Sequence, residues 1–194
     1  MTNFVSFTEG GEVSHVDHLV FNLVAPAADT GSVTSLISKS LKGLATGVAA
    51  RFDSDPLIDY RAQRPLMNFR NGRLVGMRRD GIVLSHATDV EGHRFLHLNG
   101  TEPDFQWDAL LADILDVIER FGVTRTYSFT AIAATTPHTR PADMVVRQTV
   151  PDPGRVVLEA DFWFPASFAD YVEFHLGKLG GVSHTNVAVR VPMY

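Results

Sequence analysis

The chain has 194 residues, of which 45% are apolar and 20% charged, so it can fold as a globular domain, and disordered and collagen-like classes are excluded. It contains no cysteine, which excludes disulfide scaffolds, thiolate nucleophiles and cysteine-ligated zinc. A formal net charge of −5 argues against nucleic acid as a partner. No apolar run is long enough to span a membrane, and the N-terminus lacks the basic start of a secretory signal. Because a chain without cysteine suits a reducing compartment, we expect a cytoplasmic protein.

The first part of the chain predicts a strand, a helix and a second strand. Residues 1–16 have mixed polarity and indicate a tail or an edge segment. Residues 18–25 are mostly apolar and are followed by a proline, which is typical of a strand buried on both faces. Apolar residues then recur at helical spacing over 33–44, and the run 48–52 fits a second strand.

The middle of the chain predicts antiparallel strands joined by tight turns. Asn71-Gly72 is among the strongest hairpin signals, because both central residues of such a turn need a positive φ angle. We expect a β-rich excursion that is continuous with the main sheet at its end. Its strand-like runs are residues 66–69, 73–77, 82–85 and 94–98.

The last part of the chain predicts two amphipathic helices and several strands. Residues 104–121 carry a wide apolar stripe, with Asp104 expected to cap the start of the helix and Gly122 to end it. The second helix is predicted over 166–179. The strands are predicted over residues 127–133, 144–150, 156–164 and 186–191.

Strands that alternate with helices indicate an α/β fold, in which a mostly parallel sheet carries helices on its faces. We expect residues 17–194 to form one such domain. Loops that follow parallel strands meet at one edge of the sheet, where open α/β sheets bind ligands. Asp29, Asn99 and Glu102 lie in such loops and are candidate ligand-binding residues.

A stiff loop at the same edge carries two further candidates, His138 and Arg140. Pro137 and Pro141 restrict the backbone of this loop. It suits an anion or a carbonyl group, with His138 as donor or proton carrier. Alternatively, the loop is a rigid corner in which Arg140 pairs with an acid. In both cases we expect Arg140 close to Glu102, on neighbouring strands.

Six arginines cluster within residues 61–79. A phosphate-binding patch is one interpretation. A solvated hairpin face is the other, and it fits better because arginine outnumbers lysine 14 to 3 in the whole chain. The arginines are Arg61, Arg64, Arg70, Arg73, Arg78 and Arg79.

The sequence carries none of the common catalytic motifs. The phosphate loop, G-x-G-x-x-G, G-x-S-x-G and H-E-x-x-H are all absent, which disfavours the enzyme classes that they mark. His15 and His18 have ligand-like spacing but no partner cluster around them. We therefore predict no cofactor and no metal site.

Three motifs in order resemble those of a known family. Residues 59–65 read D-Y-R-A-Q-R-P, residues 100–107 read G-T-E-P-D-F-Q-W, and residues 137–141 read P-H-T-R-P. In this order and spacing they resemble the proteasome assembly chaperone two family, in its bacterial, uncharacterised branch. The resemblance covers residues 20–194.

The resemblance implies a three-layer α/β/α sandwich similar to the nucleoside phosphorylase and hydrolase fold. Eukaryotic members pair with another subunit to assist proteasome assembly, and bacterial members resemble homo-oligomers of undefined role. The resemblance also implies that relatives continue into a further, mostly helical C-terminal part, which we expect residues 17–194 to lack. The sequence also departs from the family pattern over residues 25–31 and at Met193, where relatives have a histidine.

We therefore predict an oligomerising, assembly-chaperone-like interaction protein without catalytic residues. We expect a homo-oligomer, trimeric or larger, with a different protein partner as a further option, and neither nucleic acid nor a membrane as a partner. Its contact surface is expected to be apolar with an arginine-rich rim and to include Phe69 and Met77.

The alternative is an enzyme or a sensor for a nucleoside-like or anionic ligand. Its cleft would lie at the carboxyl ends of the strands. His138, Glu102 and Asp29 would be the catalytic residues, and Arg140 would hold the anionic group.

Overall fold

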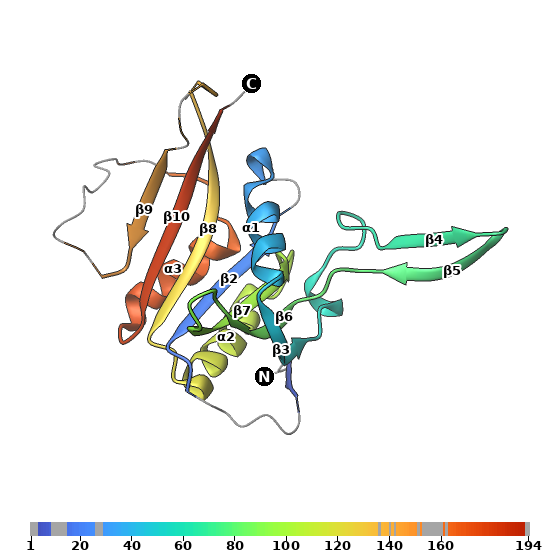
Figure 1. Ribbon diagram of the computed structural model, residues 1–194, viewed down its shortest axis with the longest axis horizontal. Helices are drawn as coiled ribbons and strands as arrows, with labels where there is room; N and C mark the ends of the chain where they lie inside the picture. The colour runs from blue at the N-terminus through green and yellow to red at the C-terminus, as the bar shows by residue number, and fades with distance from the viewer. Residues whose placement is uncertain are drawn as a thin grey trace.

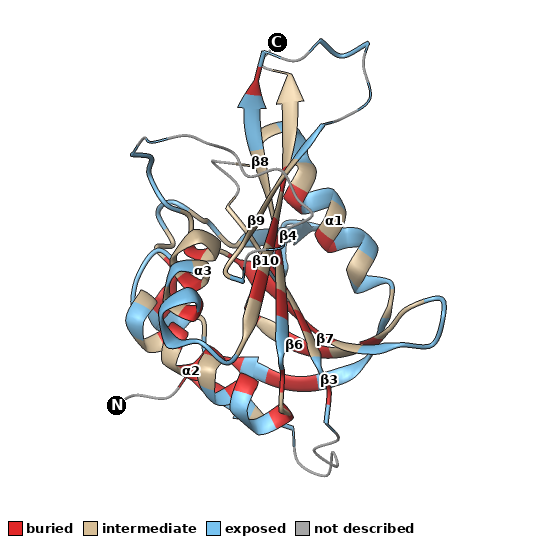
Figure 2. Ribbon diagram, turned by 90° about the vertical axis from the view of Figure 1, so that its left-hand side faces the viewer, coloured by how far each residue is buried: buried red, intermediate tan, exposed pale blue. Residues whose placement is uncertain are grey.

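A large β-sheet lies between helices on both of its faces in the computed structural model of the protein (Figure 2). Helix α1 (Val33–Lys42) covers one face, whereas α2 (Trp107–Phe121) and α3 (Phe168–Leu179) cover the other. This arrangement gives the three layers that the family resemblance implied. The described residues are 4–8, 15–25, 29–135, 137–139, 141, 143–150, 152, 161 and 163–192.

The sheet is parallel at its centre and antiparallel toward its margins. In the described part of the chain, the strand order is β1 (Val5–Phe7), β3 (Ala45–Phe52), β6 (Val83–Thr88), β7 (Arg94–Thr101), β2 (His18–Val24), β8 (Arg125–Ala134), β10 (Ser183–Pro192) and β9 (Met144–Gln148). The pairs β7–β2, β2–β8 and β8–β10 are parallel, and the pairs β1–β3, β3–β6, β6–β7 and β9–β10 are antiparallel. The mostly parallel sheet that we expected is therefore a mixed one.

The main hydrophobic core lies between the sheet and the layer of α2 and α3. Leu19 of β2 and Leu96 of β7 pair in register and are fully buried, and Ile114 of α2 and Val172 of α3 belong to the same core cluster. Side chains of a strand alternate between the two faces of a sheet. Residues of the other set therefore face α1, as Asn22 does when its amide donates to the Thr34 carbonyl at 3.2 Å.

Helix α2 ends as the sequence predicts but begins differently. Gly122 adopts a φ of +67°, a left-handed backbone conformation that favours glycine at the end of a helix. Asp104 does not cap the helix. Its carboxylate accepts hydrogen bonds from the Asp59 amide at 2.7 Å and from the Gln63 side chain at 3.0 Å. The Asp104 carboxylate, which the local pattern assigned to the start of the helix, thus binds a loop that is distant in sequence.

The segment after β3 forms a hairpin that stands apart from the main sheet. Strands β4 (Leu66–Arg70) and β5 (Arg73–Arg78) make a separate two-stranded sheet that projects from the rest of the protein (Figure 1). Asn71 and Gly72 at its turn have φ angles of 50° and 79°, as the hairpin signal predicts. The expected excursion is thus divided, because β6 and β7 belong to the main sheet.

Two further predictions concern the ends of the sheet. Part of the segment 1–16 forms the edge strand β1, which pairs with β3. Most of the strand predicted over 156–164, namely residues 156–160 and 162, lies outside the described residues.

Two histidines, His97 and His184, are fully buried. Burial lowers the pKa of each imidazole from 6.5 to about 4. The ring of His184 contacts the hydroxyls of Thr126 at 2.8 Å and Ser128 at 3.0 Å. Neither ring nitrogen of His97 has a hydrogen-bond partner among the described residues. The two side chains are therefore equally buried, but only the ring of His184 is hydrogen-bonded to described residues.

Acid is expected to destabilise the fold through these histidines. The native pKa of about 4 lies below the ordinary value of 6.5, so between these values the unfolded chain binds protons that the native protein does not. Stability should be complete above this window and should fall toward its lower end, by roughly 3 kcal/mol for each histidine. His97→Phe should remove the part of this acid-induced loss that His97 causes, because it deletes a titrating group without breaking a hydrogen bond. Urea unfolding of both proteins at neutral and acidic pH measures the difference.

His184→Phe is the matched control. It leaves the buried hydroxyls of Thr126 and Ser128 without this partner, so stability at neutral pH should fall by roughly 1–3 kcal/mol. Burial raises the pKa of Glu102 and Asp113, which titrate in the opposite sense, and their contribution cancels when the two variants are compared. An equal loss of stability at neutral pH in both variants would contradict the conclusion that only the ring of His184 is hydrogen-bonded.

Candidate functional site

Strands β2 and β8 separate part-way along their length. They pair only between His18 and Phe21 of β2 and the opposite residues of β8. Beyond Phe21, β2 remains paired with β7, and β8 remains paired with β10, so each strand keeps a hydrogen-bonded neighbour. A gap therefore opens between the two strands toward their carboxyl ends.

This gap lies at a point where the strand order reverses. Strands β2 and β7 lie on one side of the gap, and strands β8 and β10 lie on the other. Open α/β sheets bind ligands at such a point, outside the carboxyl ends of the strands. A cavity of about 450 Å³ lies there, a volume within the range of about 300–1,000 Å³ that is usual for small-molecule sites. Its wall is mostly apolar, with Leu23, Phe129, Ile132 and Phe164 as its larger side chains.

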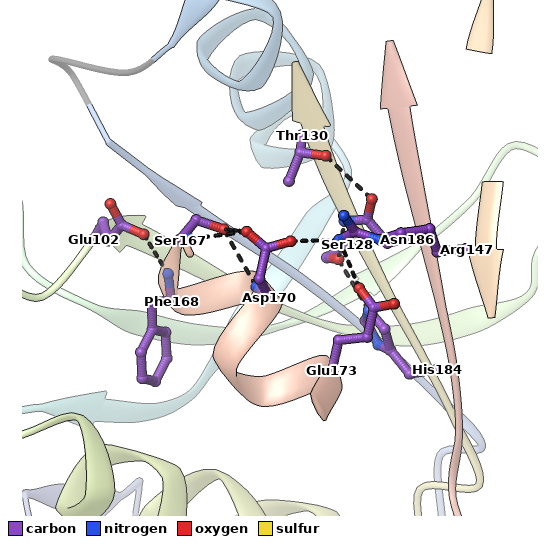
Figure 3. A network of polar contacts seen from close by, with 10 residues as sticks. All are labelled: Glu102, Ser128, Thr130, Arg147, Ser167, Phe168, Asp170, Glu173, His184 and Asn186. Atoms are coloured by element: carbon purple, nitrogen blue, oxygen red, sulfur yellow. Dashed lines mark hydrogen bonds and ion pairs between the residues drawn. The ribbon is translucent and has the colours of Figure 1, made fainter. Parts of the chain in front are cut away.

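The start of helix α3 forms one polar wall of the cavity. Ser167 caps the helix by accepting a hydrogen bond from the Asp170 amide, and Asp170 accepts in return from the Ser167 amide at 2.8 Å. Glu102, directly after β7, accepts a hydrogen bond from the Phe168 amide at 2.5 Å (Figure 3). Burial raises the pKa of the Glu102 carboxyl, although this hydrogen bond acts against the rise.

Arg147 of the edge strand β9 connects that strand to helix α3. Its guanidinium forms ion pairs with Asp170 and with Glu173, the latter at 2.7 Å (Figure 3). The two carboxylates are 15% and 16% exposed. Burial acts to lower the pKa of Arg147, but the two carboxylates outweigh it and raise the pKa. The guanidinium that borders the cavity is thus already neutralised by two acids.

A ladder of polar side chains, half-buried at Thr130 and buried further along, extends from the cavity along β8 and β10. Thr130 donates to the Asn186 side chain at 3.1 Å, the Asn186 amide donates to Ser128 at 2.8 Å, and Ser128 contacts His184 (Figure 3). Burying such groups costs free energy unless each finds a partner, and here they satisfy one another. The ladder therefore fixes the register of the two strands below the cavity.

Asp29 lies on the opposite side, at the start of α1. Its two carboxylate oxygens accept hydrogen bonds from the Thr34 amide at 2.8 Å and the Ser35 amide at 3.0 Å. Burial acts to raise the pKa of Asp29, but the hydrogen bonds from Ser35 and Thr34 outweigh it and lower the pKa. The carboxylate thus replaces the missing helix cap and stays ionised.

The structure brings together only part of the predicted site. Asp29 and Glu102 both line the cavity. Asn99 does not, because it is buried in β7 and donates to the Val83 carbonyl at 3.3 Å. His138 is exposed and is not among the lining residues, and Arg140 lies outside the described residues.

The expected adjacency of the Glu102 and His138 loops is wrong. Both loops follow parallel strands at the same edge of the sheet, but β2 lies between β7 and β8. Of the predicted catalytic group, Asp29 and Glu102 line the cavity and His138 does not. Among the described lining residues, the polar side chains that the sequence did not suggest are Thr34, Thr130, Arg147, Ser167 and Asp170. Only the spacing Ser167-x-x-Asp170, typical of a capping box, could have indicated two of them.

The described ranges contain neither a cluster of metal-ligating side chains nor a membrane-spanning helix. No group of three or more histidine, aspartate or glutamate side chains there could hold a metal ion. No helix of the described chain is long and apolar enough to cross a membrane.

The β4–β5 hairpin is a second candidate surface. Six large apolar side chains along it are 51–68% exposed, among them Phe69 and Met77. Isolated apolar residues on a surface are ordinary, but a contiguous exposed group indicates an interaction site. The six are Leu66, Met67, Phe69, Leu74, Val75 and Met77.

Comparison with known proteins identifies the family. The PAC2 family model matches residues 23–194. The chain belongs to the PAC2 family. No curated protein matches it in sequence.

Solved structures agree with the PAC2 assignment. A Mycobacterium tuberculosis protein of unknown function is 25% identical with a TM-score of 0.89, over 100% of this chain and 70% of that one. A Corynebacterium glutamicum protein of unknown function is 27% identical with a TM-score of 0.86, over 98% and 73%. A proteasome-assembly chaperone homologue of M. tuberculosis is 20% identical with a TM-score of 0.80, over 91% and 76%. The family predicted from the three motifs is thus confirmed, whereas the likeness to nucleoside phosphorylases stays a prediction.

Removal of the Arg147 guanidinium is expected to destabilise this PAC2 protein. Arg147→Ala leaves Asp170 and Glu173 as mostly buried carboxylates without their cation. The free energy of unfolding should fall by about 2 kcal/mol or more. Chemical denaturation at neutral pH measures the loss.

Arg190→Ala is the control for this variant. The Arg190–Asp143 ion pair also lies at this margin of the sheet, at 3.0 Å, but its side chains are 41% and 59% exposed. Solvent screens such a pair, and the loss should stay below about 1 kcal/mol. Equal losses in the two variants would show that Arg147 is no more than a surface charge.

Proposed function

We propose that this PAC2-family protein is an oligomerising, assembly-chaperone-like interaction protein and that copies of the chain contact one another through the β4–β5 hairpin. The exposed apolar hairpin is the observation that carries the proposal. The similarity to a proteasome-assembly chaperone homologue supports the same class of function.

The hairpin is expected to be only marginally stable when it is surrounded by water. A two-stranded sheet alone is marginally stable, because it has too little apolar area to bury. All residues of β4 and β5 are exposed, so the described part of the chain covers neither face of the hairpin. Covering its apolar side chains with another protein surface would stabilise both the hairpin and the complex.

Charge favours a second copy as the covering surface. The hairpin and its flanking residues, 61–79 in all, contain six arginines and no acidic residue, a charge of +6. Because the whole chain carries −5, the remaining residues carry −11. A basic hairpin on an acidic body is complementary to the body of another copy, which steers association between copies.

Substitutions on the hairpin are expected to dissociate the oligomer. Phe69→Asp combined with Met77→Asp places two carboxylates in an apolar contact. Their desolvation costs more free energy than the contact contributes to association. Sedimentation velocity at micromolar concentration should show oligomers for the wild-type protein, trimeric or larger, and monomers for the double variant. High salt should also weaken the wild-type oligomer, because charge contributes to it.

Val90→Asp is the matched control, since Val90 is 96% exposed in the turn between β6 and β7 and lies away from the hairpin. This variant should remain oligomeric. A monomeric wild-type protein, or a double variant that assembles like the wild type, would overturn the proposal. Oligomers that form only when another protein is added would assign the hairpin to that partner instead.

A further inference from the structure

The cavity between β2 and β8 has a chemistry of its own that the hairpin does not explain. Its described charged lining residues are three carboxylates, Asp29, Glu102 and Asp170, and one guanidinium, Arg147. The guanidinium is shared between Asp170 and Glu173. No cation among the described lining residues is left to hold an anionic ligand.

The two helix starts at the cavity are also occupied by acids. Backbone amides at a helix start ordinarily attract anions. Here the Thr34 and Ser35 amides of α1 donate to Asp29, and the Phe168 amide of α3 donates to Glu102. The positions that a phosphate or carboxylate ligand would take are thus filled by the side chains of the protein.

Glu102 is the acid that retains capacity for a ligand. Its Oε1 atom accepts from the Phe168 amide, and no described residue donates to Oε2. Burial destabilises this carboxylate and raises its pKa, so a cation beside it would relieve an unfavourable charge. Asp170, in contrast, is held by Arg147 and by Ser167.

A second polar group lies in the opposite wall, at the start of α1. Thr34 is 9% exposed, and its hydroxyl lies near the Asp29 carboxylate but forms no hydrogen bond of good geometry with a described residue. Buried polar groups are nearly always hydrogen-bonded, so such an exception calls for an explanation. A ligand that donates hydrogen bonds would supply the missing partner.

We propose that this cavity binds a small organic cation, an amine or a guanidine with an apolar body. The charged group lies against Glu102, and the body lies against Leu23, Phe129 and Ile132. The volume of about 450 Å³ and the mostly apolar wall fit such a molecule. This replaces the anionic ligand expected from the sequence with one of the opposite charge.

Three probes of one shape test the charge preference. Isothermal titration calorimetry at neutral pH compares 2-phenylethylamine, 2-phenylethanol and 3-phenylpropanoate, which carry a cationic, a neutral and an anionic group on a similar body. The amine should bind about tenfold more tightly than the alcohol, and the carboxylate should not bind. A carboxylate that binds as well as the amine, or three probes that all fail to bind, would overturn the proposal.

Variants locate the binding site. Glu102→Gln keeps an acceptor for the Phe168 amide, so the fold is retained, and it should reduce amine affinity to that of the alcohol. Ala131→Trp should fill the cavity and abolish the binding of both probes. Asp143→Asn removes an acid outside the cavity and should leave the amine affinity unchanged. Unchanged amine binding in the first two variants would contradict the assigned site.

The proposal is independent of the hairpin contact. The double variant at Phe69 and Met77 changes no described lining residue, so it should bind the amine like the wild-type protein. Failure of one proposal therefore leaves the other standing.

Discussion

The separation of β2 and β8 beyond Phe21 is the feature on which the rest of the site depends. Each strand keeps a partner on its other side, so the gap leaves the ladders of β2 with β7 and of β8 with β10 intact. The gap must then be bordered by groups that satisfy one another. Glu102 holds the start of α3, Asp29 holds the start of α1, and Arg147 connects β9 to α3. A cavity between two helix starts is the result.

The two candidate surfaces follow opposite physical rules. At the cavity, charged and polar groups are brought into the protein and paired with one another, so that their desolvation is offset. At the hairpin, apolar side chains such as Phe69 are left in water, and arginines accompany them. The first arrangement suits a small molecule, and the second suits a protein surface. Membership of the PAC2 family agrees with the second.

Local signals in the sequence predicted the elements but not how distant elements meet. The apolar run of β2, the stripe of α2 and the Asn71-Gly72 turn each act within a few residues, and the structure contains all three. Asp29 and Glu102 were also found, because loops after parallel strands share one edge. The order of strands is a non-local property, so the position of β2 between β7 and β8 was missed. Arg147 was missed for the same reason, because its two acids lie on a helix more than twenty residues away.

The central claim is that the β4–β5 hairpin is held in place by another copy of the chain. Hydrogen–deuterium exchange of its backbone amides as a function of protein concentration tests this claim most directly. The amides of Leu66–Arg70 and Arg73–Arg78 should be protected at high concentration and should exchange freely on dilution, while those of the buried strand β2 stay protected throughout. Hairpin amides whose exchange does not change with concentration would contradict the account.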